Sequence, residues 1–200
     1  ANEQVKEGFC ERCDTSVVQK DLTQWFFKIS GYAEELLYNA SLDWPEKTRL
    51  MQQHWIGKKT GIEIDYDVVG WKEKISVFTT RPDTNFGATF LVVAPDGDFV
   101  KRNIDRFPNK EAVKTYVEES LKKTELERLS EGKKKTGAPT GLFAINQLNN
   151  RQMPIYVGDF VLSTVGTGNV VAVPGHDLRD FEFAKAMNLE IIRVVVGSDG

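Results

Sequence analysis

The chain has 200 residues, and its 26 Lys+Arg against 29 Asp+Glu give a formal net charge of −3. This balance excludes a generally basic nucleic-acid-binding protein, because phosphate affinity requires clustered positive charge. Hydrophobic residues make up 40% of the chain and charged residues 28%, as in a folded domain. No apolar run approaches the roughly 18 residues of a membrane-spanning helix, and no secretory leader opens the sequence. We therefore expect a soluble, cytoplasmic protein without a membrane partner.

The only two cysteines, Cys10 and Cys13, form a C-x-x-C motif. A disulfide scaffold would use more cysteines, and a closed structural zinc site needs four ligands. Three interpretations remain open: half of a zinc site whose other ligands lie outside this chain, a redox pair, or two ordinary thiols. Zinc is therefore expected here only if ligands come from elsewhere.

Residues 1–57 are expected to form a small helical region. Apolar residues from Leu22 to Leu37 recur at steps of three and four, which predicts an amphipathic helix over 22–37. A turn at Asp43-Trp44-Pro45 precedes a second predicted helix over 46–54, which ends before Gly57.

After Gly57 the pattern changes to short strands. Asn149-Asn150 suits a tight hairpin, because asparagine tolerates positive φ, and Lys133-Lys134-Lys135 is expected in a solvated loop. The expected helices cover 110–129 and 177–187, and the expected strands cover 62–69, 74–80, 90–94, 141–148, 153–162, 169–173 and 190–196. Regular alternation of strands and helices is missing, so we expect a mainly β fold with peripheral helices, built as a β-barrel.

The segment 79–84, Thr79-Thr80-Arg81-Pro82-Asp83-Thr84, gathers three hydroxyls, a guanidinium and a carboxylate where a strand ends. Such a turn can present hydroxyls and backbone N–H groups to a polar ligand. The alternative is a type I turn with Pro82 at its second position.

A second polar cluster runs from His176 to Phe183. Asp177 is placed as a helix N-cap, and Asp180 could complete an arrangement like a capping box. Asp180 could instead accept hydrogen bonds from an ammonium group. The Gly166-Thr167-Gly168 turn before it allows close backbone approach to a ligand, although a hairpin explains it equally.

Read together, these segments resemble the editing domain of bacterial-type leucyl-tRNA synthetases. TTRPDT at 79–84 is similar to the threonine-rich loop of that family, and GTGNVVAVPGHDLRDFEFA at 166–184 is similar to its second motif. The segments CERC at 10–13, QWF at 24–26 and MQQHWIG at 51–57 resemble the stretch that leads from the zinc module into the editing insertion. The valyl enzymes typically have Glu where Asp83 stands.

The resemblance implies a closed six-stranded β-barrel with peripheral helices over 58–200, joined to a connector over 1–57. It implies hydrolysis of the ester of tRNA(Leu) wrongly charged with norvaline, isoleucine or a similar amino acid. The implied partners are the aminoacylated acceptor end of that tRNA and the rest of the synthetase, with the fragment itself a monomer and no cofactor for editing. The ATP-binding HIGH and KMSKS signatures are absent from this sequence, so it is not expected to activate an amino acid.

The same resemblance assigns roles to individual residues. Asp180 would bind the α-ammonium group, while Thr79 and Thr80 would contact the amino acid and the attacking water. Thr84 would crowd the γ-branch of leucine and so protect the correct product. The remaining implied substrate-binding residues are Arg81, Asp83, Val171, Val173, His176, Asp177 and Arg179.

Four positions depart from the family pattern: Asn85 stands for an apolar residue, Val165 for tyrosine, Val171 for methionine and His54 for asparagine. Two other functions therefore stay in view, a tRNA acceptor-end binding module without catalysis and an editing domain for the valine system.

Overall fold

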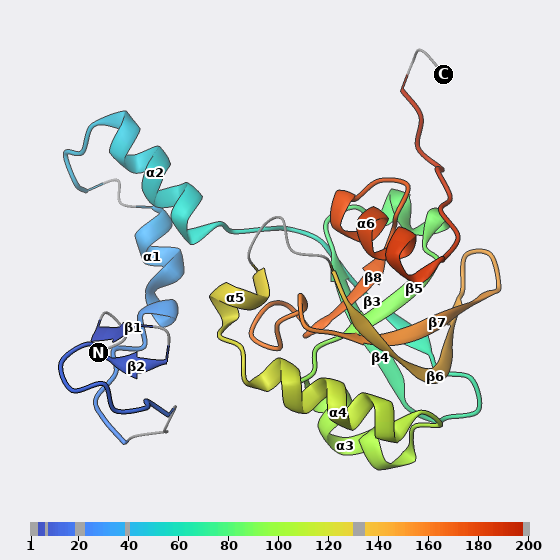
Figure 1. Ribbon diagram of the computed structural model, residues 1–200. Helices are drawn as coiled ribbons and strands as arrows, with labels where there is room; N and C mark the ends of the chain where they lie inside the picture. The colour runs from blue at the N-terminus through green and yellow to red at the C-terminus, as the bar shows by residue number, and fades with distance from the viewer. Residues whose placement is uncertain (1–3, 7, 19–22, 39–40, 130–134, 198–200) are drawn as a thin grey trace. The chain divides into compact units, whose positions relative to one another are not determined.

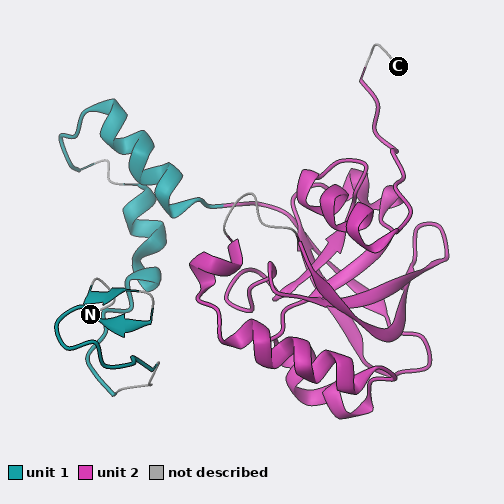
Figure 2. Cartoon of the chain, viewed as in Figure 1, with its two compact units in different colours: residues 1–58 teal, residues 59–200 magenta. Residues whose placement is uncertain are grey.

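A computed structural model describes the chain except for residues 1–3, 7, 19–22, 39–40, 130–134 and 198–200 (Figure 1). The chain divides into two compact units, residues 1–58 and residues 59–200 (Figure 2). Among the described residues, no helix is both long enough and apolar enough to cross a membrane.

Unit 1 contains a two-stranded antiparallel sheet, a 3-10 turn and two helices: β1 (Val5–Lys6), β2 (Phe9–Cys10), η2 (Ile29–Tyr32), α1 (Ala33–Leu37) and α2 (Glu46–Ile56). The predicted helix over 46–54 is confirmed and is two residues longer at its C-terminal end. It ends at Gly57, whose φ of 63° is the left-handed conformation favoured by glycine.

The predicted helix over 22–37 is wrong over most of its length. Residues 23–28 are not helical, the α-helix covers only Ala33–Leu37, and Leu22 lies outside the described residues. Trp25 and Phe27 are fully exposed within unit 1. An apolar stripe with no surface to pack against does not stabilise a helix, since short helices depend on tertiary burial.

Unit 2 is built on two sheets. The strands β3 (Ile62–Asp67) and β4 (Lys74–Thr79) form an antiparallel pair. The second sheet has the order β6-β7-β5-β8, with strands β5 (Phe90–Val93), β6 (Gly137–Asn146), β7 (Arg151–Gly158) and β8 (Asn169–Ala172). The β5–β7 pair is parallel, and the pairs β5–β8 and β6–β7 are antiparallel.

The closed six-stranded barrel is wrong for this structure, because neither sheet closes on itself or on the other. The sheets approach each other at two seams. At one seam Val68 and Ala144 form an isolated bridge, and at the other Asn169 Nδ2 donates to the carbonyl of Ser76 at 3.1 Å. Among the described residues, the backbone ladder does not continue across these seams, so the fold is a mixed α/β arrangement of separate sheets.

Both faces of the four-stranded sheet are buried. Leu91, Val93 and Ile155 belong to a core shared with β3, β4 and the helix α4. Phe90 and Tyr156, on the opposite face, pack with Phe183 of the C-terminal helix. This explains why β5 is a continuous apolar run: strands buried on both faces lose the polar alternation.

The predicted helix over 110–129 is two helices. α3 (Asp98–Asn103) and η4 (Ile104–Arg106) precede α4 (Lys110–Leu121), and α5 (Glu125–Leu129) follows after a break. At the break, Thr124 N donates to Glu127 Oε2 at 2.7 Å, and Glu127 N donates to Thr124 Oγ1 at 3.2 Å. This reciprocal pair is a capping box, which begins a new helix.

The predicted strand over 190–196 is also wrong, since no described residue of that segment is in a strand. The hairpin turn at 149–150 is confirmed, with Asn150 at a φ of 57° between β6 and β7. Lys133 and Lys134 of the predicted basic loop lie outside the described residues.

Candidate functional site

The helix α6 (Leu178–Met187) begins with a cap supplied by its own sequence. Asp177 has an extended backbone, and its Oδ1 accepts hydrogen bonds from the backbone N–H groups of Arg179 at 2.8 Å and Asp180 at 3.2 Å. The predicted N-cap is therefore confirmed. Arg179 is exposed, and its Nε lies 3.6 Å from the same carboxylate.

Asp180 does not complete a capping box as expected. Its Oδ2 accepts from the backbone N–H of Val173 at 2.8 Å, so it ties the first turn of α6 to the end of β8. Asp180 is buried, with only 5% of the residue exposed. Burial raises the pKa of this carboxyl to about 7, an effect that the hydrogen bond from Val173 partly offsets. Among the described residues, no other hydrogen-bond donor reaches this carboxylate.

The threonine-rich segment forms a 3-10 helix, η3 (Pro82–Gly87), rather than an isolated type I turn. Thr84 is buried, and its Oγ1 donates to the carbonyl of Arg81 at 2.8 Å. Arg81 and Asp83 form a two-pronged ion pair in solvent, with Nε–Oδ1 at 3.0 Å and Nη2–Oδ2 at 2.8 Å. This pair lowers the pKa of Asp83 and keeps its carboxylate charged.

Thr79 and Thr80 stand where β4 ends. Thr79 pairs with Ile62 in the β3–β4 ladder, and its Oγ1 accepts from the backbone N–H of Arg81 at 3.1 Å. That bond leaves the hydroxyl proton of Thr79 available to donate elsewhere. Thr80 is exposed.

The C-terminal segment, residues 192–195, contacts both the end of η3 and the turn that precedes α6. A Cβ at Gly87 would lie 2.8 Å from the carbonyl oxygen of Ile192, and a Cβ at Gly175 would overlap the same oxygen. His176 Nε2 accepts from the backbone N–H groups of Val194 at 3.0 Å and Val195 at 3.2 Å. The ends of both motifs therefore lie side by side against one extended segment. His176 Nε2 therefore serves there as a hydrogen-bond acceptor for the backbone.

Of the two valines, Val171 lies on β8 and Val173 is the first residue after it. Val171 pairs with Leu91, and its buried side chain belongs to the main core. Val173 is half-buried, packs against that core, and donates its N–H to Asp180.

Among the described residues, no hydrogen bond or ion pair joins Thr79, Thr80 or Thr84 to Asp180. A cavity of about 440 Å³ is lined by residues of η3, β3 and the β6–β7 turn, and Asp83 is the predicted site residue among them. The structure thus brings the two motifs into one neighbourhood through the C-terminal segment rather than through direct side-chain contact.

Sequence reasoning missed a buried polar network behind η3. Tyr66 OH donates to Asn85 Oδ1 at 2.6 Å, and Asn146 Nδ2 donates to the carbonyl of Asn85 at 2.9 Å. At most 2% of the surface of each residue is exposed. The available signal was the polar Asn85, which departs from the apolar residue expected at that position, since a buried amide needs partners.

A second missed feature is the burial of Arg128 in α5. Its guanidinium donates to the carbonyls of Asp159 and Val161, each at 2.7 Å, and pairs with Asp96. These bonds fix the loop that follows β7 and leads toward Gly166-Thr167-Gly168.

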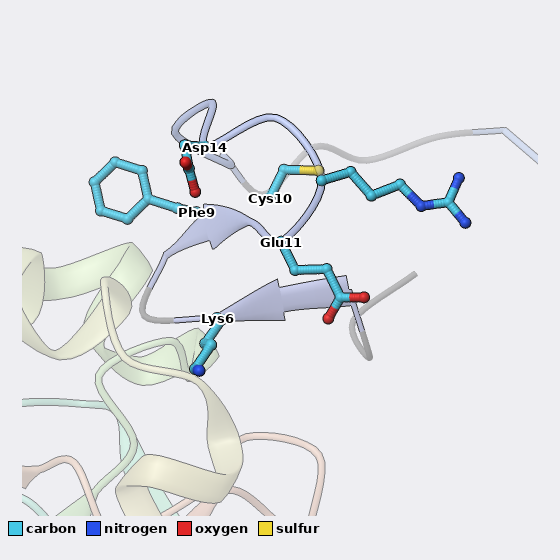
Figure 3. Close-up of a pocket in the computed structure, with 6 residues that line it drawn as sticks. Lys6, Phe9, Cys10, Glu11 and Asp14 are labelled. Atoms are coloured by element: carbon cyan, nitrogen blue, oxygen red, sulfur yellow. The ribbon is translucent and has the colours of Figure 1, made fainter.

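Cys10, in unit 1, lines a cavity of about 750 Å³ together with Lys6, Phe9, Glu11, Arg12 and Asp14 (Figure 3). The thiols of Cys10 and Cys13 are unpaired, and a hydrogen bond with Thr15 lowers the pKa of Cys13. No group of three or more His, Cys, Asp or Glu side chains among the described residues could hold a metal ion. The described part of the chain therefore does not by itself supply a closed zinc site.

Comparison with known proteins places this geometry in a family. A family model described as "Leucyl-tRNA synthetase, editing domain" matches residues 53–200. The leucine–tRNA ligase of Clostridium kluyveri is 53% identical over 98% of this chain and 24% of that protein, and the Clostridium tetani enzyme is 51% identical over 100% and 24%. The chain thus spans about a quarter of the length of these relatives.

The chain is also similar to a solved leucyl-tRNA synthetase structure. The ternary complex of Agrobacterium radiobacter K84 agnB2 LeuRS with tRNA and LeuAMS matches with a TM-score of 0.73 and 36% identity, over 98% of this chain and 24% of that one. The family model covers well over half of the residues. The chain therefore belongs to the leucyl-tRNA synthetase editing-domain family.

Proposed function

We propose that this chain hydrolyses the aminoacyl ester of tRNA(Leu) misacylated with norvaline, isoleucine or a similar amino acid, as the editing part of a leucyl-tRNA synthetase. The observation that carries the proposal is the buried carboxylate of Asp180, which has one oxygen bonded to Val173 N–H and no other described donor. An α-ammonium group would supply the missing charge-assisted hydrogen bonds.

In the proposed reaction, a water molecule attacks the ester carbonyl. The bond from the carbonyl carbon to the ribose oxygen of the terminal adenosine breaks, and the products are a free amino acid and a tRNA with its hydroxyl restored. Thr79 has a hydroxyl proton to offer because its oxygen already accepts from Arg81 N–H. We assign Thr79 and Thr80 to orienting the water and the aminoacyl group.

The need for a second step follows from the size of the discrimination. One methylene in an apolar pocket is worth only about 1–3 kcal/mol, so a synthetic site cannot fully reject close analogues of leucine. We assign Thr84 to excluding the leucine side chain from hydrolysis. Its buried side chain is held by the carbonyl of Arg81, which gives it a fixed position for that role.

The other residues would shape the site around these groups. Asp177 and His176 hold the start of α6 and the C-terminal segment in place. Arg81, Asp83 and Arg179 are exposed charges within the two motifs. Val171 and Val173 would line the pocket for the amino-acid side chain and the terminal adenosine.

The proposed partners are the aminoacylated acceptor end of tRNA(Leu) and the remainder of a cytoplasmic synthetase, with this chain monomeric. The net charge of −3 fits a module that contacts a short part of the tRNA and depends on the rest of the enzyme for affinity.

A deacylation assay tests the proposal. Purified chain is mixed with isoleucyl- or norvalyl-tRNA(Leu), and release of the amino acid is followed. The same assay is run on a Clostridium kluyveri enzyme in which this chain replaces the matching segment, because an isolated module can bind tRNA weakly. Binding without release in both formats would favour the acceptor-end binding module. Release from misacylated tRNA(Val) alone would favour the valine system.

A further inference from the structure

The 3-10 helix η3 is short, and bonds within its own segment hold it only in part. It is six residues long, and its N-cap residue Arg81 makes no side-chain cap. The hydrogen bonds from Thr84 N to the carbonyl of Arg81 and from Ala88 N to the carbonyl of Asn85 are both 3.2 Å. The bond from Thr84 Oγ1 to the carbonyl of Arg81, at 2.8 Å, holds the Thr84 side chain within η3. A short 3-10 helix still has poor hydrogen-bond geometry, so contacts from elsewhere help to fix the orientation of the helix.

Those contacts come from strands far away in the sequence. Tyr66 on β3 donates from its hydroxyl to Asn85 Oδ1, and Asn146 at the end of β6 donates from Nδ2 to the Asn85 carbonyl. Asn149 in the β6–β7 turn adds a bond from Nδ2 to the carbonyl of Phe86 at 3.2 Å. One residue, Asn85, is thus held at both its side chain and its backbone.

The anchors themselves are rigid. Tyr66 lies in the β3–β4 ladder opposite Ile75 and within the main core. Asn146 pairs with Arg151 in the β6–β7 ladder, and its Oδ1 accepts from Leu148 N at 3.1 Å. Burial raises the pKa of Tyr66 to about 12, so its hydroxyl remains a donor at any physiological pH. Buried hydrogen bonds of this kind specify one arrangement, because an unmade bond leaves a polar group without a partner.

Thr84 directly precedes Asn85 in the chain. A change in the backbone orientation of Asn85 therefore moves the Thr84 side chain. A displacement of about 1 Å at a reacting site can change rates about a hundredfold, and a steric sieve that separates leucine from its analogues has a similar tolerance.

We propose that Tyr66 and Asn146 are positioning residues that act through Asn85 to fix η3 in the orientation that Thr84 needs to exclude the leucine side chain. The inference rests on the proposed hydrolytic function and adds to it the network that sets its specificity.

The test is Tyr66→Phe in the Clostridium kluyveri enzyme carrying this chain, because it removes one hydroxyl and keeps the ring. We measure hydrolysis of isoleucyl-tRNA(Leu) and leucyl-tRNA(Leu) and compare the ratio of their rates. The expected result is a ratio at least about fivefold lower than in the unmodified enzyme, with leucyl-tRNA(Leu) hydrolysis raised.

Tyr116→Phe is the matched control. Tyr116 is half-buried, and like that of Tyr66 its hydroxyl is hydrogen-bonded: it donates to the carbonyl of Thr136 and accepts from Asp159 N. Among the described residues it has no bond to η3, and it lies on α4. We expect this variant to keep the ratio of the unmodified enzyme. An equal fall in both variants would overturn the inference, since general loss of stability would then explain it.

A second pair of variants keeps the test decisive if Tyr66→Phe folds poorly. Asn149→Ala removes one exposed contact to η3 and is expected to lower the ratio less, about twofold. Tyr66→Phe combined with Asn85→Leu removes both buried polar partners, so its folding temperature should recover while its ratio stays low. An unchanged ratio in all these variants, beside an active unmodified enzyme, would overturn this inference alone. An inactive unmodified enzyme would overturn it together with the proposed function.

Discussion

The two motifs of the proposed site are held in place in opposite ways. At the start of α6, Asp177 caps the helix from within the motif, and Asp180 reaches only seven residues back to Val173. At η3, the anchors Tyr66 and Asn146 are 19 and 61 residues away from Asn85. The motif at α6 is thus built locally, and the motif at η3 is held by the tertiary fold. Substitutions in the α6 motif should remove chemistry with little effect on geometry. Substitutions around η3 should change its geometry and therefore the selectivity of hydrolysis.

The largest expected effect is the loss of hydrolysis in Asp180→Ala. Removing a charge that binds the substrate ammonium should slow deacylation of isoleucyl-tRNA(Leu) about a thousandfold. The helix should survive, because its cap at Asp177 is untouched, and circular dichroism checks this. Asp180→Asn keeps an acceptor for Val173 N–H but has no charge, so it should be nearly as inactive. Activity in Asp180→Asn close to that of the unmodified chain would refute the ammonium assignment.

The next effect is on stability and depends on pH. The folded pKa of Asp180 is raised from 3.8 to about 7, mainly by burial, so between these values folding takes up a proton. The contribution of this group to stability is therefore complete below about pH 4 and is lost as pH rises toward 7. Asp180→Asn does not ionise, so it should gain stability relative to the unmodified chain over that window, on the order of 4 kcal/mol.

Urea unfolding of both proteins at several pH values between 4 and 8 measures this difference. The two stability curves should diverge as pH rises. If the two curves of stability against pH stay parallel, the Asp180 carboxylate is solvated in the folded protein. The α6 motif could then not be described as built around a buried carboxylate.

A smaller effect is expected at the segment that contacts both motifs. His176→Phe removes the acceptor for the N–H groups of Val194 and Val195, which should cost about 1–2 kcal/mol of unfolding free energy. Hydrogen exchange at these two amides should become faster. His54→Phe, at the other histidine of the chain and on α2 of unit 1, serves as the control and should leave both amides unchanged. Equal protection in the two variants would show that His176 does not hold this segment.

The same contrast explains what the sequence could predict. The strands β3, β4, β5 and β8 and the helices α2 and α6 follow from local periodicity and end signals, and all were predicted close to their observed bounds. The cap at Asp177 was predictable for the same reason. The resemblance of the two motifs to the family was also sound, because it rests on contiguous residues.

Most of the wrong predictions concern features that depend on distant contacts, and the break at Thr124 is the local exception. The helix over 22–37 has an amphipathic pattern without a buried surface, and the segment 190–196 has strand composition but bonds to a histidine ring instead of a strand. The T-x-x-E spacing of Thr124 and Glu127 was a readable capping-box signal for the break, but the prediction followed the amphipathic pattern across it. The closed barrel failed at the seams between sheets, where one isolated bridge replaces a ladder. The Tyr66–Asn85 bond joins the strand β3 to the 3-10 helix η3, and neither residue alone indicates the other.

The smallest expected effect separates the volume of Thr84 from its hydrogen bond. Thr84→Ala removes the side-chain bulk, so hydrolysis of leucyl-tRNA(Leu) should rise about tenfold, the discrimination that roughly one methylene provides. Thr84→Val keeps the shape but loses the bond to the carbonyl of Arg81. If the external network alone holds η3, the valine variant should still spare the leucine ester. Thr115→Ala, at an exposed threonine of α4, controls for unspecific effects. Leucine release by the valine variant at the rate of the alanine variant would mean that η3 depends on its own internal bond, and the contrast between the two motifs would then not hold.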